Sequence, residues 1–231
     1  MKTLLFDIDG TLIATNDAGT HALSRAMRVA FDITVPNMDV KFGGRTDSSL
    51  FRELLSLNGL QPTHDNFETL CKAYKTQLPA SLACCGGTIL PGVPDLLEKL
   101  TMQDGVTCCV MTGNLHATAT MKLEHFGLSD YFEQIFGGDF DEDRRHLARR
   151  SRLFLHGKHA QGSNEATRQQ RTIVVIGDTP ADINCALDIN AICLAVCTGH
   201  FSHQSLELAG AHAVFENLND VTQVVDWLLR Q

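Results

Sequence analysis

Short apolar runs recur along the chain, and each of them ends at a polar turn that contains glycine. Residues 3–6, 106–111 and 172–176 have this form. Runs of this length and composition are typical of strands that are buried on both faces of a parallel sheet. Residues 191–196 and 213–215 are also short and apolar, so they are predicted to be further strands of the same sheet.

Segments with helical periodicity lie between these runs. They cover residues 114–126, about 143–156 and 179–188. Strands that alternate with helices favour an α/β fold, in which helices cover both faces of a doubly wound parallel sheet of the Rossmann type. We therefore expect this fold for the main part of the chain.

The first third of the chain interrupts this alternation. Residues 18–31, 47–58 and 65–78 have helical patterns that follow one another without a strand between them. Two glycines at residues 86–87 mark the return to the alternating pattern.

These patterns predict two domains. Residues 16–88 form a small all-helical insertion, and residues 1–15 and 89–231 form the main α/β domain.

Composition and charge narrow the class of protein. Apolar residues make up 44% of the chain and charged residues 20%, which is typical of a folded globular protein. The net charge is −8 and there is no long basic run, so we expect no nucleic-acid partner and no binding to anionic membranes. No apolar run approaches the length of a membrane span or a signal-peptide core.

The eight cysteines are expected to be free thiols. Cys84-Cys85 and Cys108-Cys109 are adjacent pairs, and no cysteine and histidine spacing matches a zinc site. Free thiols favour a reducing cytoplasm.

Polar residues gather at the predicted strand ends. Asp7, Thr112 and Asp178 each follow one of the apolar runs. Because the carboxyl ends of parallel strands meet at one edge of a sheet, where ligands bind, we expect these side chains to lie together. An acidic residue next to a glycine, such as Gly10, is also common in simple turns. The agreement of three strand ends favours a functional site.

Three motifs resemble those of the haloacid dehalogenase superfamily. They occupy residues 7–11 (Asp-Ile-Asp-Gly-Thr), 111–114 (Met-Thr-Gly-Asn) and 177–182 (Gly-Asp-Thr-Pro-Ala-Asp). Their order and spacing match the superfamily, as does the position of the helical insertion after the first strand. The resemblance covers essentially the whole chain, and it implies a hydrolase with a helical cap like that of phosphoglycolate phosphatases.

The resemblance assigns roles to both acids of the first motif. Asp7 is expected to be the nucleophile, since an aspartate carboxylate can attack phosphorus and form an aspartyl phosphate. Asp9 would protonate the leaving alcohol and then deprotonate the attacking water. Dehalogenases and phosphonatases lack a second acid at this position, so Asp9 favours phosphate esters as substrates.

The resemblance also implies a magnesium ion, which prefers oxygen ligands. Its ligands would be Asp7, the main-chain carbonyl of Asp9, and Asp178. Asp182 lies four residues after Asp178, where it could hold a metal-bound water or orient a basic group. The alternative for Asp182 is an ordinary acidic residue at a helix start.

Thr112, Gly113 and Asn114 are predicted to bind the phosphate of the substrate. A threonine hydroxyl and the main-chain N–H groups of a helix that begins near Asn114 would supply the donors. The alternative is that Thr112 only caps this helix.

The basic residue of this site has two candidates. The superfamily usually has a lysine before the strand of the last motif, but the only lysine in residues 137–171 is Lys158, late in the predicted helix. Arg144, at the start of that helix, is better placed to stabilise phosphoryl charge. Lys122, two turns into the helix after residue 114, is the rival, and a plain salt bridge is the alternative for either.

A loop of the helical insertion, residues 42–47, resembles the superfamily's cap loop that reaches over the active site. Arg45 in this loop is a candidate for contacting an anionic substrate. The alternative is that Thr46 or Asp47 caps the following helix while Arg45 is solvated.

These assignments predict a magnesium-dependent phosphatase that acts on a small phosphorylated metabolite. A sugar-phosphate mutase that uses the same aspartyl phosphate is the alternative enzyme. A binding module that has lost turnover is disfavoured, because all of the acidic positions are present. The sequence carries no signal for an oligomeric state.

Overall fold

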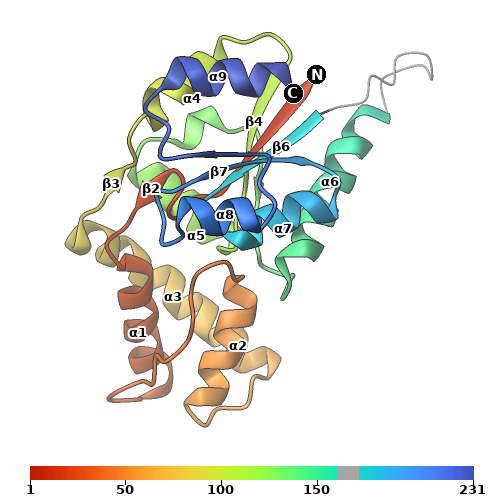
Figure 1. The fold of residues 1–231 in the computed structure, drawn as a ribbon. Coiled ribbons are helices and arrows are strands. Elements are labelled where there is room, and N and C mark those ends of the chain that lie inside the picture. Colours follow the sequence, from red (N-terminus) through yellow and green to blue (C-terminus); the bar gives the residue numbers. More distant parts are fainter. Residues whose placement is uncertain (161–171) are drawn as a thin grey trace.

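A computed structural model describes residues 1–160 and 172–231 of the chain. The centre of the molecule is a six-stranded sheet with the order β5-β4-β1-β6-β7-β8, and all of its strand pairs are parallel (Figure 1). Its strands are β1 (Lys2–Phe6), β4 (Val106–Met111), β5 (Ile135–Phe136), β6 (Thr172–Gly177), β7 (Ile192–Val196) and β8 (Ala213–Phe215).

Helices cover both faces of this sheet. Side chains of α4 (Val93–Thr101), α5 (His116–His125) and α9 (Val221–Arg230) form one apolar cluster with the strands. Side chains of α6 (Arg144–Ala160), α7 (Pro180–Asp188) and α8 (His203–Leu208) form the cluster on the opposite face. A short 3-10 helix, η1, spans Ser129–Tyr131. The predicted doubly wound α/β fold is confirmed.

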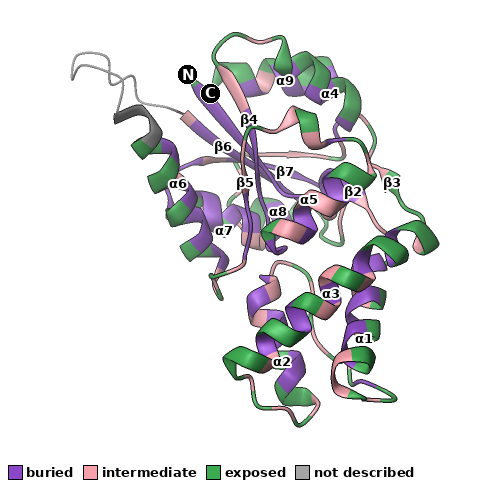
Figure 2. Ribbon diagram, turned by 180° about the vertical axis from the view of Figure 1, so that it is seen from behind, coloured by how far each residue is buried: buried purple, intermediate pink, exposed green. Residues whose placement is uncertain are grey.

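The strand β1 is buried along its whole length, and it lies in the middle of the sheet (Figure 2). Leu4 and Phe6 enter one apolar cluster, whereas Leu5 enters the other. This alternation is the consequence of the two-residue period of a strand with helices on both faces.

Three helices form a separate bundle below the sheet in Figure 1. They are α1 (Ala18–Phe31), α2 (Asp47–Leu57) and α3 (His64–Cys85). Their apolar faces share one cluster, in which the rings of Phe51 and Tyr74 meet edge to face at 5.3 Å. Leu115 of the main part of the chain belongs to the same cluster, so the bundle also packs against the α/β part. The division into domains at residues 16 and 88 stays a prediction.

A two-stranded antiparallel ribbon joins the bundle to the sheet. It consists of β2 (Ile13–Ala14) and β3 (Thr88–Ile89). Beside it, the Asn16 side-chain amide donates a hydrogen bond to the Cys85 carbonyl at 3.3 Å. The two chain connections therefore run side by side.

The predicted end of the third helix of the bundle was wrong. The third helix of the bundle was expected to end at residue 78, but α3 continues through Pro79 to Cys85. Leu78 and Leu82 on either side of Pro79 are buried in the bundle, and this packing outweighs the hydrogen bond that a proline removes. The helix expected over residues 114–126 is α5, which begins at His116 and ends at His125.

Candidate active site

The predicted strand-end residues lie together at the carboxyl edge of the sheet. Phe6 of β1 pairs with Val110 of β4 and Ile176 of β6, so the residues that follow these strands emerge at the same level. Asp7, Thr112 and Asp178 are all buried there, with at most 6% of each residue exposed. They line one cavity of about 470 Å³ between the sheet edge and the helical bundle.

One corner of this cavity collects carboxylates. Asp7, Asp178 and Asp182 each offer an oxygen, and these oxygens all lie within 4.8 Å of one another. The Arg144 guanidinium adjoins them, with Nη2 2.6 Å from Asp182 Oδ1 and 3.4 Å from Asp7 Oδ2. Three buried carboxylates therefore share one buried cation, and we call these residues the Arg144 corner.

The pKa values of two carboxyl groups in this corner are raised by burial and by the neighbouring negative charges. Burial raises the pKa of Asp7 to about 6, with repulsion from Asp182 and Asp9 adding to it and Arg144 opposing it. Burial also raises the pKa of Asp178 to about 8, and repulsion from Asp182 and Asp7 adds to it. Buried carboxylates that lack enough positive charge hold their protons more tightly.

This corner fits a divalent cation. Both Asp182 oxygens are already used, because Oδ1 binds Arg144 and Oδ2 accepts from the Thr179 main chain and hydroxyl at 3.1 and 2.7 Å. Asp7 and Asp178 are the carboxylates left to hold a metal, and carboxylate oxygens are the ligands that Mg²⁺ prefers. Two extra positive charges would balance the corner.

Asp182 has two structural tasks at once. Its side chain and that of Thr179 form a capping box at the start of α7, and it also binds Arg144. The sequence allows Asp182 to be an acid at a helix start or the partner of a basic group. The structure shows both contacts.

The other corner of the cavity is centred on Asp9. The Lys122 ammonium lies 2.8 and 2.7 Å from the two oxygens of Asp9 and 2.8 Å from Asn114 Oδ1. The Asn114 amide donates to Asp9 Oδ2 and to Thr112 Oγ1, both at 2.8 Å. We call this set the Lys122 corner, and here one carboxylate is matched by one cation.

Both basic candidates therefore lie in the site, with different partners. Arg144 contacts Asp7, and Lys122 contacts Asp9. Only 6% of Arg144 and 4% of Lys122 is exposed, so neither is a solvated surface residue. Lys158 lies in α6, and its side chain is outside the described residues.

Two main-chain amides at the start of α5 are engaged by carboxylates, and phosphate binding by Thr112, Gly113 and Asn114 stays a prediction. The Leu115 N–H donates to Asp47 Oδ2 and the His116 N–H donates to Asp139 Oδ2, both at 2.8 Å. Carboxylates of the protein thus occupy the amides that the helix dipole would offer to an anion. The Thr112 hydroxyl accepts from Asn114, so its own proton remains a donor toward the cavity.

Arg45 is engaged within the helical bundle. Its Nε donates to Ser49 Oγ at 3.2 Å and its Nη1 is paired with Glu53, both on α2. The Thr46 hydroxyl caps α2 by accepting from the Ser49 N–H at 3.2 Å. A contact between Arg45 and a substrate stays a prediction, and in this structure the guanidinium is held by α2.

Three residues that were not predicted as part of the site, Gly10, Thr11 and Gly199, shape the surroundings of Asp178. The Thr11 hydroxyl donates to Asp178 Oδ1 at 3.2 Å. A Cβ atom on Gly199 would lie 1.8 Å from Asp178 Oδ2, and one on Gly10, where φ is +81°, would lie 2.5 Å from the same atom. These two glycines are therefore needed for the carboxylate to fit. Thr11 and Gly10 belong to the first motif, but nothing in the sequence around Gly199 indicates its place.

The comparisons with known proteins agree with this geometry. Residues 4–196 match the family model of the haloacid dehalogenase-like hydrolases. A phosphoglycolate phosphatase of Rhodobacter capsulatus is 30% identical over 166 residues, which are 68% of this chain and 72% of that protein. A phosphoglycolate phosphatase of Rhodospirillum rubrum is 25% identical, with 98% of this chain and 90% of that protein covered.

Solved structures show the same fold. A phosphatase predicted in Clostridium acetobutylicum superposes with a TM-score of 0.69 at 23% identity, over 100% of this chain and 99% of that one. The family model matches more than half of the chain, and the alignments with the two relatives cover most of this chain. The chain therefore belongs to the haloacid dehalogenase-like hydrolase family, as the motifs predict, and it is a phosphatase of that family.

Proposed function

We propose that this protein is a magnesium-dependent phosphatase that hydrolyses a small phosphate monoester through an aspartyl phosphate on Asp7. The observation that supports this most is the separate pairing of the two acids of the first motif. Asp7 lies beside Arg144 in a corner with excess negative charge, and Asp9 lies beside Lys122 in a balanced one. The mechanism requires two separate carboxylates, a nucleophile and a proton carrier, and Asp7 and Asp9 line one cavity beside different basic residues.

In the first step, an oxygen of Asp7 attacks phosphorus and the bond between phosphorus and the alcohol oxygen breaks. Protonated Asp9 gives its proton to the departing alcohol. In the second step, a water molecule gives a proton to Asp9 and the water oxygen attacks phosphorus. The bond between phosphorus and the Asp7 oxygen breaks, which releases inorganic phosphate and restores the Asp7 carboxylate. Arg144 and the Thr112 hydroxyl stabilise the phosphoryl charge in both steps.

Asp7, Asp178 and, by the family resemblance, the main-chain carbonyl of Asp9 would hold Mg²⁺. The ion would offset the repulsion between the Asp7 carboxylate and the phosphate. Arg144 is kept in place by Asp182, and Asp9 is oriented by Lys122 and the Asn114 amide.

The names of the curated relatives make phosphoglycolate the first substrate to test. No helix in residues 1–160 and 172–231 is long and apolar enough to cross a membrane. Cysteines such as Cys84 on the surface and Cys193 in the core are free thiols, which supports the proposed cytoplasmic location.

The proposal is tested with purified protein, Mg²⁺ and a panel of small phosphate esters, and phosphate release is measured. We expect turnover that is lost in Asp7→Asn and kept in Asp104→Asn, a matched change at an exposed loop before β4, at the other end of the sheet. If no ester is hydrolysed and Asp7→Asn changes nothing, the proposal is wrong. Stoichiometric isomer formation from a hexose 1-phosphate, without phosphate release, would instead show a mutase.

A further inference from the structure

We infer that the substrate's leaving group carries no negative charge, so that the ester lacks a carboxylate or second phosphate beside the transferred one. This inference rests on the proposed phosphatase function and names the substrate class of the same site. It concerns the part of the cavity that faces the helical bundle, where the leaving group would lie.

The cations of the cavity are already engaged. Arg45, Lys122 and Arg144 are the lysine and arginine side chains that line it in the described part of the chain. Lys122 and Arg144 are buried against carboxylates at the sheet edge, where the phosphate would bind. Arg45 is paired with Glu53. A second anion on the substrate would therefore meet no lysine or arginine that is free of a carboxylate, and the other basic side chain that lines the cavity in the described part of the chain is the exposed His200.

The wall on the bundle side instead presents acids. Asp17, directly before α1, and Asp47, at the start of α2, both line the cavity. Asp47 uses Oδ2 to accept from the Leu115 N–H, and no basic side chain is paired with either carboxylate among the described residues. A carboxylate of the substrate would be repelled here, and it would lose water without gaining a partner.

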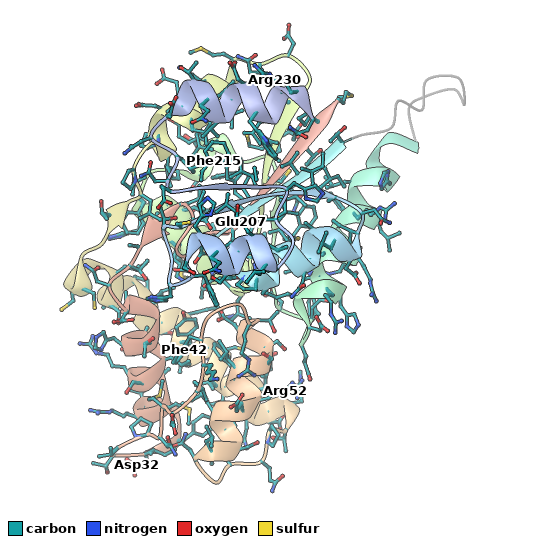
Figure 3. All side chains as sticks on the ribbon, in the orientation of Figure 1. Asp32, Phe42, Arg52, Glu207, Phe215 and Arg230 are labelled. Atoms are coloured by element: carbon teal, nitrogen blue, oxygen red, sulfur yellow. The ribbon has the colours of Figure 1, made fainter. Side chains whose placement is uncertain are left out.

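Neutral groups complete this wall. Tyr74 is 3% exposed and its ring is fixed against Phe51, while its hydroxyl end lies 3.3 Å from where a Cβ on Gly19 would be. Tyr74, Gly19 and Phe42 all line the cavity, and Figure 3 shows Phe42 at the end of the bundle nearest the sheet. A hydroxyl group and a short apolar chain fit such a surface.

Glu53 decides whether Arg45 is available. The ion pair is partly exposed, with 29% of the Arg45 side chain and 43% of the Glu53 side chain accessible, so Glu53 can be replaced without leaving a buried charge. Removal of the Glu53 charge would free the guanidinium at the cavity wall. The selectivity of the enzyme should then move toward anionic leaving groups.

The test uses two-carbon esters that differ mainly in charge. These are 2-phosphoglycolate, 2-hydroxyethyl phosphate and phosphoethanolamine, each assayed with the full chain and Mg²⁺ as a substrate and as an inhibitor of p-nitrophenyl phosphate hydrolysis. We expect kcat/KM, or the affinity as an inhibitor, to be about tenfold lower for phosphoglycolate than for the other two. A preference for phosphoglycolate, or equal values, would overturn the inference.

The variant Glu53→Gln provides the second readout. This variant should raise kcat/KM for phosphoglycolate about threefold or more and leave kcat/KM for 2-hydroxyethyl phosphate unchanged. The difference in kcat/KM between the two esters should therefore become smaller. Glu68→Gln, an exposed residue of α3, removes the same charge without freeing Arg45 and should change neither. If both variants act alike, Arg45 is not the deciding group and the inference fails. Hydrolysis of p-nitrophenyl phosphate separates these outcomes from a failure of the proposed phosphatase function, which would abolish that reaction as well.

Discussion

The Arg144 corner and the Lys122 corner lie in one cavity but differ in their balance of charge. Three buried carboxylates share one guanidinium in the first corner, and a single carboxylate meets one ammonium in the second. Asp7 and Asp9, two residues apart in one motif, thus have opposite surroundings. The difference teaches that two acids of one short motif can have different charged surroundings, because their basic partners come from two distant helices.

The largest effect is expected from Asp7→Asn, which removes the proposed nucleophile and keeps the size of the side chain. The proposed mechanism predicts a fall in kcat of more than about 10⁴-fold, measured as phosphate release. Thermal unfolding should show that the variant is folded. A variant that keeps a tenth of its activity would mean that the Arg144 corner does not hold the nucleophile.

Arg144→Ala should come next. It leaves Asp182 buried without its cation, so we expect a loss of about 3–5 kcal/mol in the free energy of unfolding and about 10²–10³-fold in kcat/KM. Denaturant unfolding and steady-state kinetics measure the two losses, and Arg144→Lys should recover part of both. An undiminished Arg144→Ala variant would reject the assignment of this residue.

Lys122→Met tests the second corner while keeping most of the apolar stem. We expect kcat to fall about 10²-fold with little change in KM, because Asp9 would be oriented less well. The loss of stability should be smaller than for Arg144→Ala, since 42% of the Asp9 side chain is exposed and water can replace the ammonium. Equal destabilisation by both variants would break the contrast between the corners.

The excess negative charge of the Arg144 corner predicts a dependence of stability on pH. The pKa of Asp178 is raised from 3.8 to about 8, so between these values the folded protein keeps a proton that the unfolded chain has lost. The metal-free protein should therefore become less stable as pH rises through this range.

Magnesium should reverse this trend. At about 100 times its Kd, Mg²⁺ would add about 2.7 kcal/mol to the free energy of unfolding. The gain in melting temperature should be larger at pH 8 than at pH 5.5, because protons compete with the metal for its carboxylate ligands at the lower pH. The variant Asp178→Asn should lose most of this difference. A gain that is equal at both pH values would argue against a metal between Asp7 and Asp178.

The smallest effect is expected from Asp47→Ala. Asp47 accepts from the Leu115 N–H and donates its own N–H to the Gly113 carbonyl at 2.7 Å, so it connects the bundle to the loop beside the Lys122 corner. Loss of this cap should cost about 1 kcal/mol in the free energy of unfolding, and Asp47→Asn should cost less. A tenfold or greater fall in activity would show that the bundle also positions the catalytic loop.

The sequence predicts the parts of this molecule that follow from local patterns. Strand ends at Asp7 and Asp178 follow from apolar runs, and the start of α6 at Arg144 follows from helical periodicity. Local patterns could not predict that Arg144 pairs with Asp7 and Lys122 with Asp9, because Lys122 and Asp9 are 113 residues apart in the sequence. The same holds for the start of α5, where Asp47 and Asp139 come from distant segments.

The position of β1 in the sheet has a consequence for synthesis. The ribosome makes the chain from the N-terminal end, so β1 is made well before its two neighbours in the sheet, β4 and β6, at residues 106–111 and 172–177. Contacts this distant in sequence form slowly, since long loops must close first. Of the strands of this sheet, β1 is thus made first but enclosed late, and Asp7 stays apart from Arg144 and Asp178 until residues 144–178 have left the ribosome. A nascent chain would carry Asp7, the proposed nucleophile, without the side chains that surround it in the folded protein.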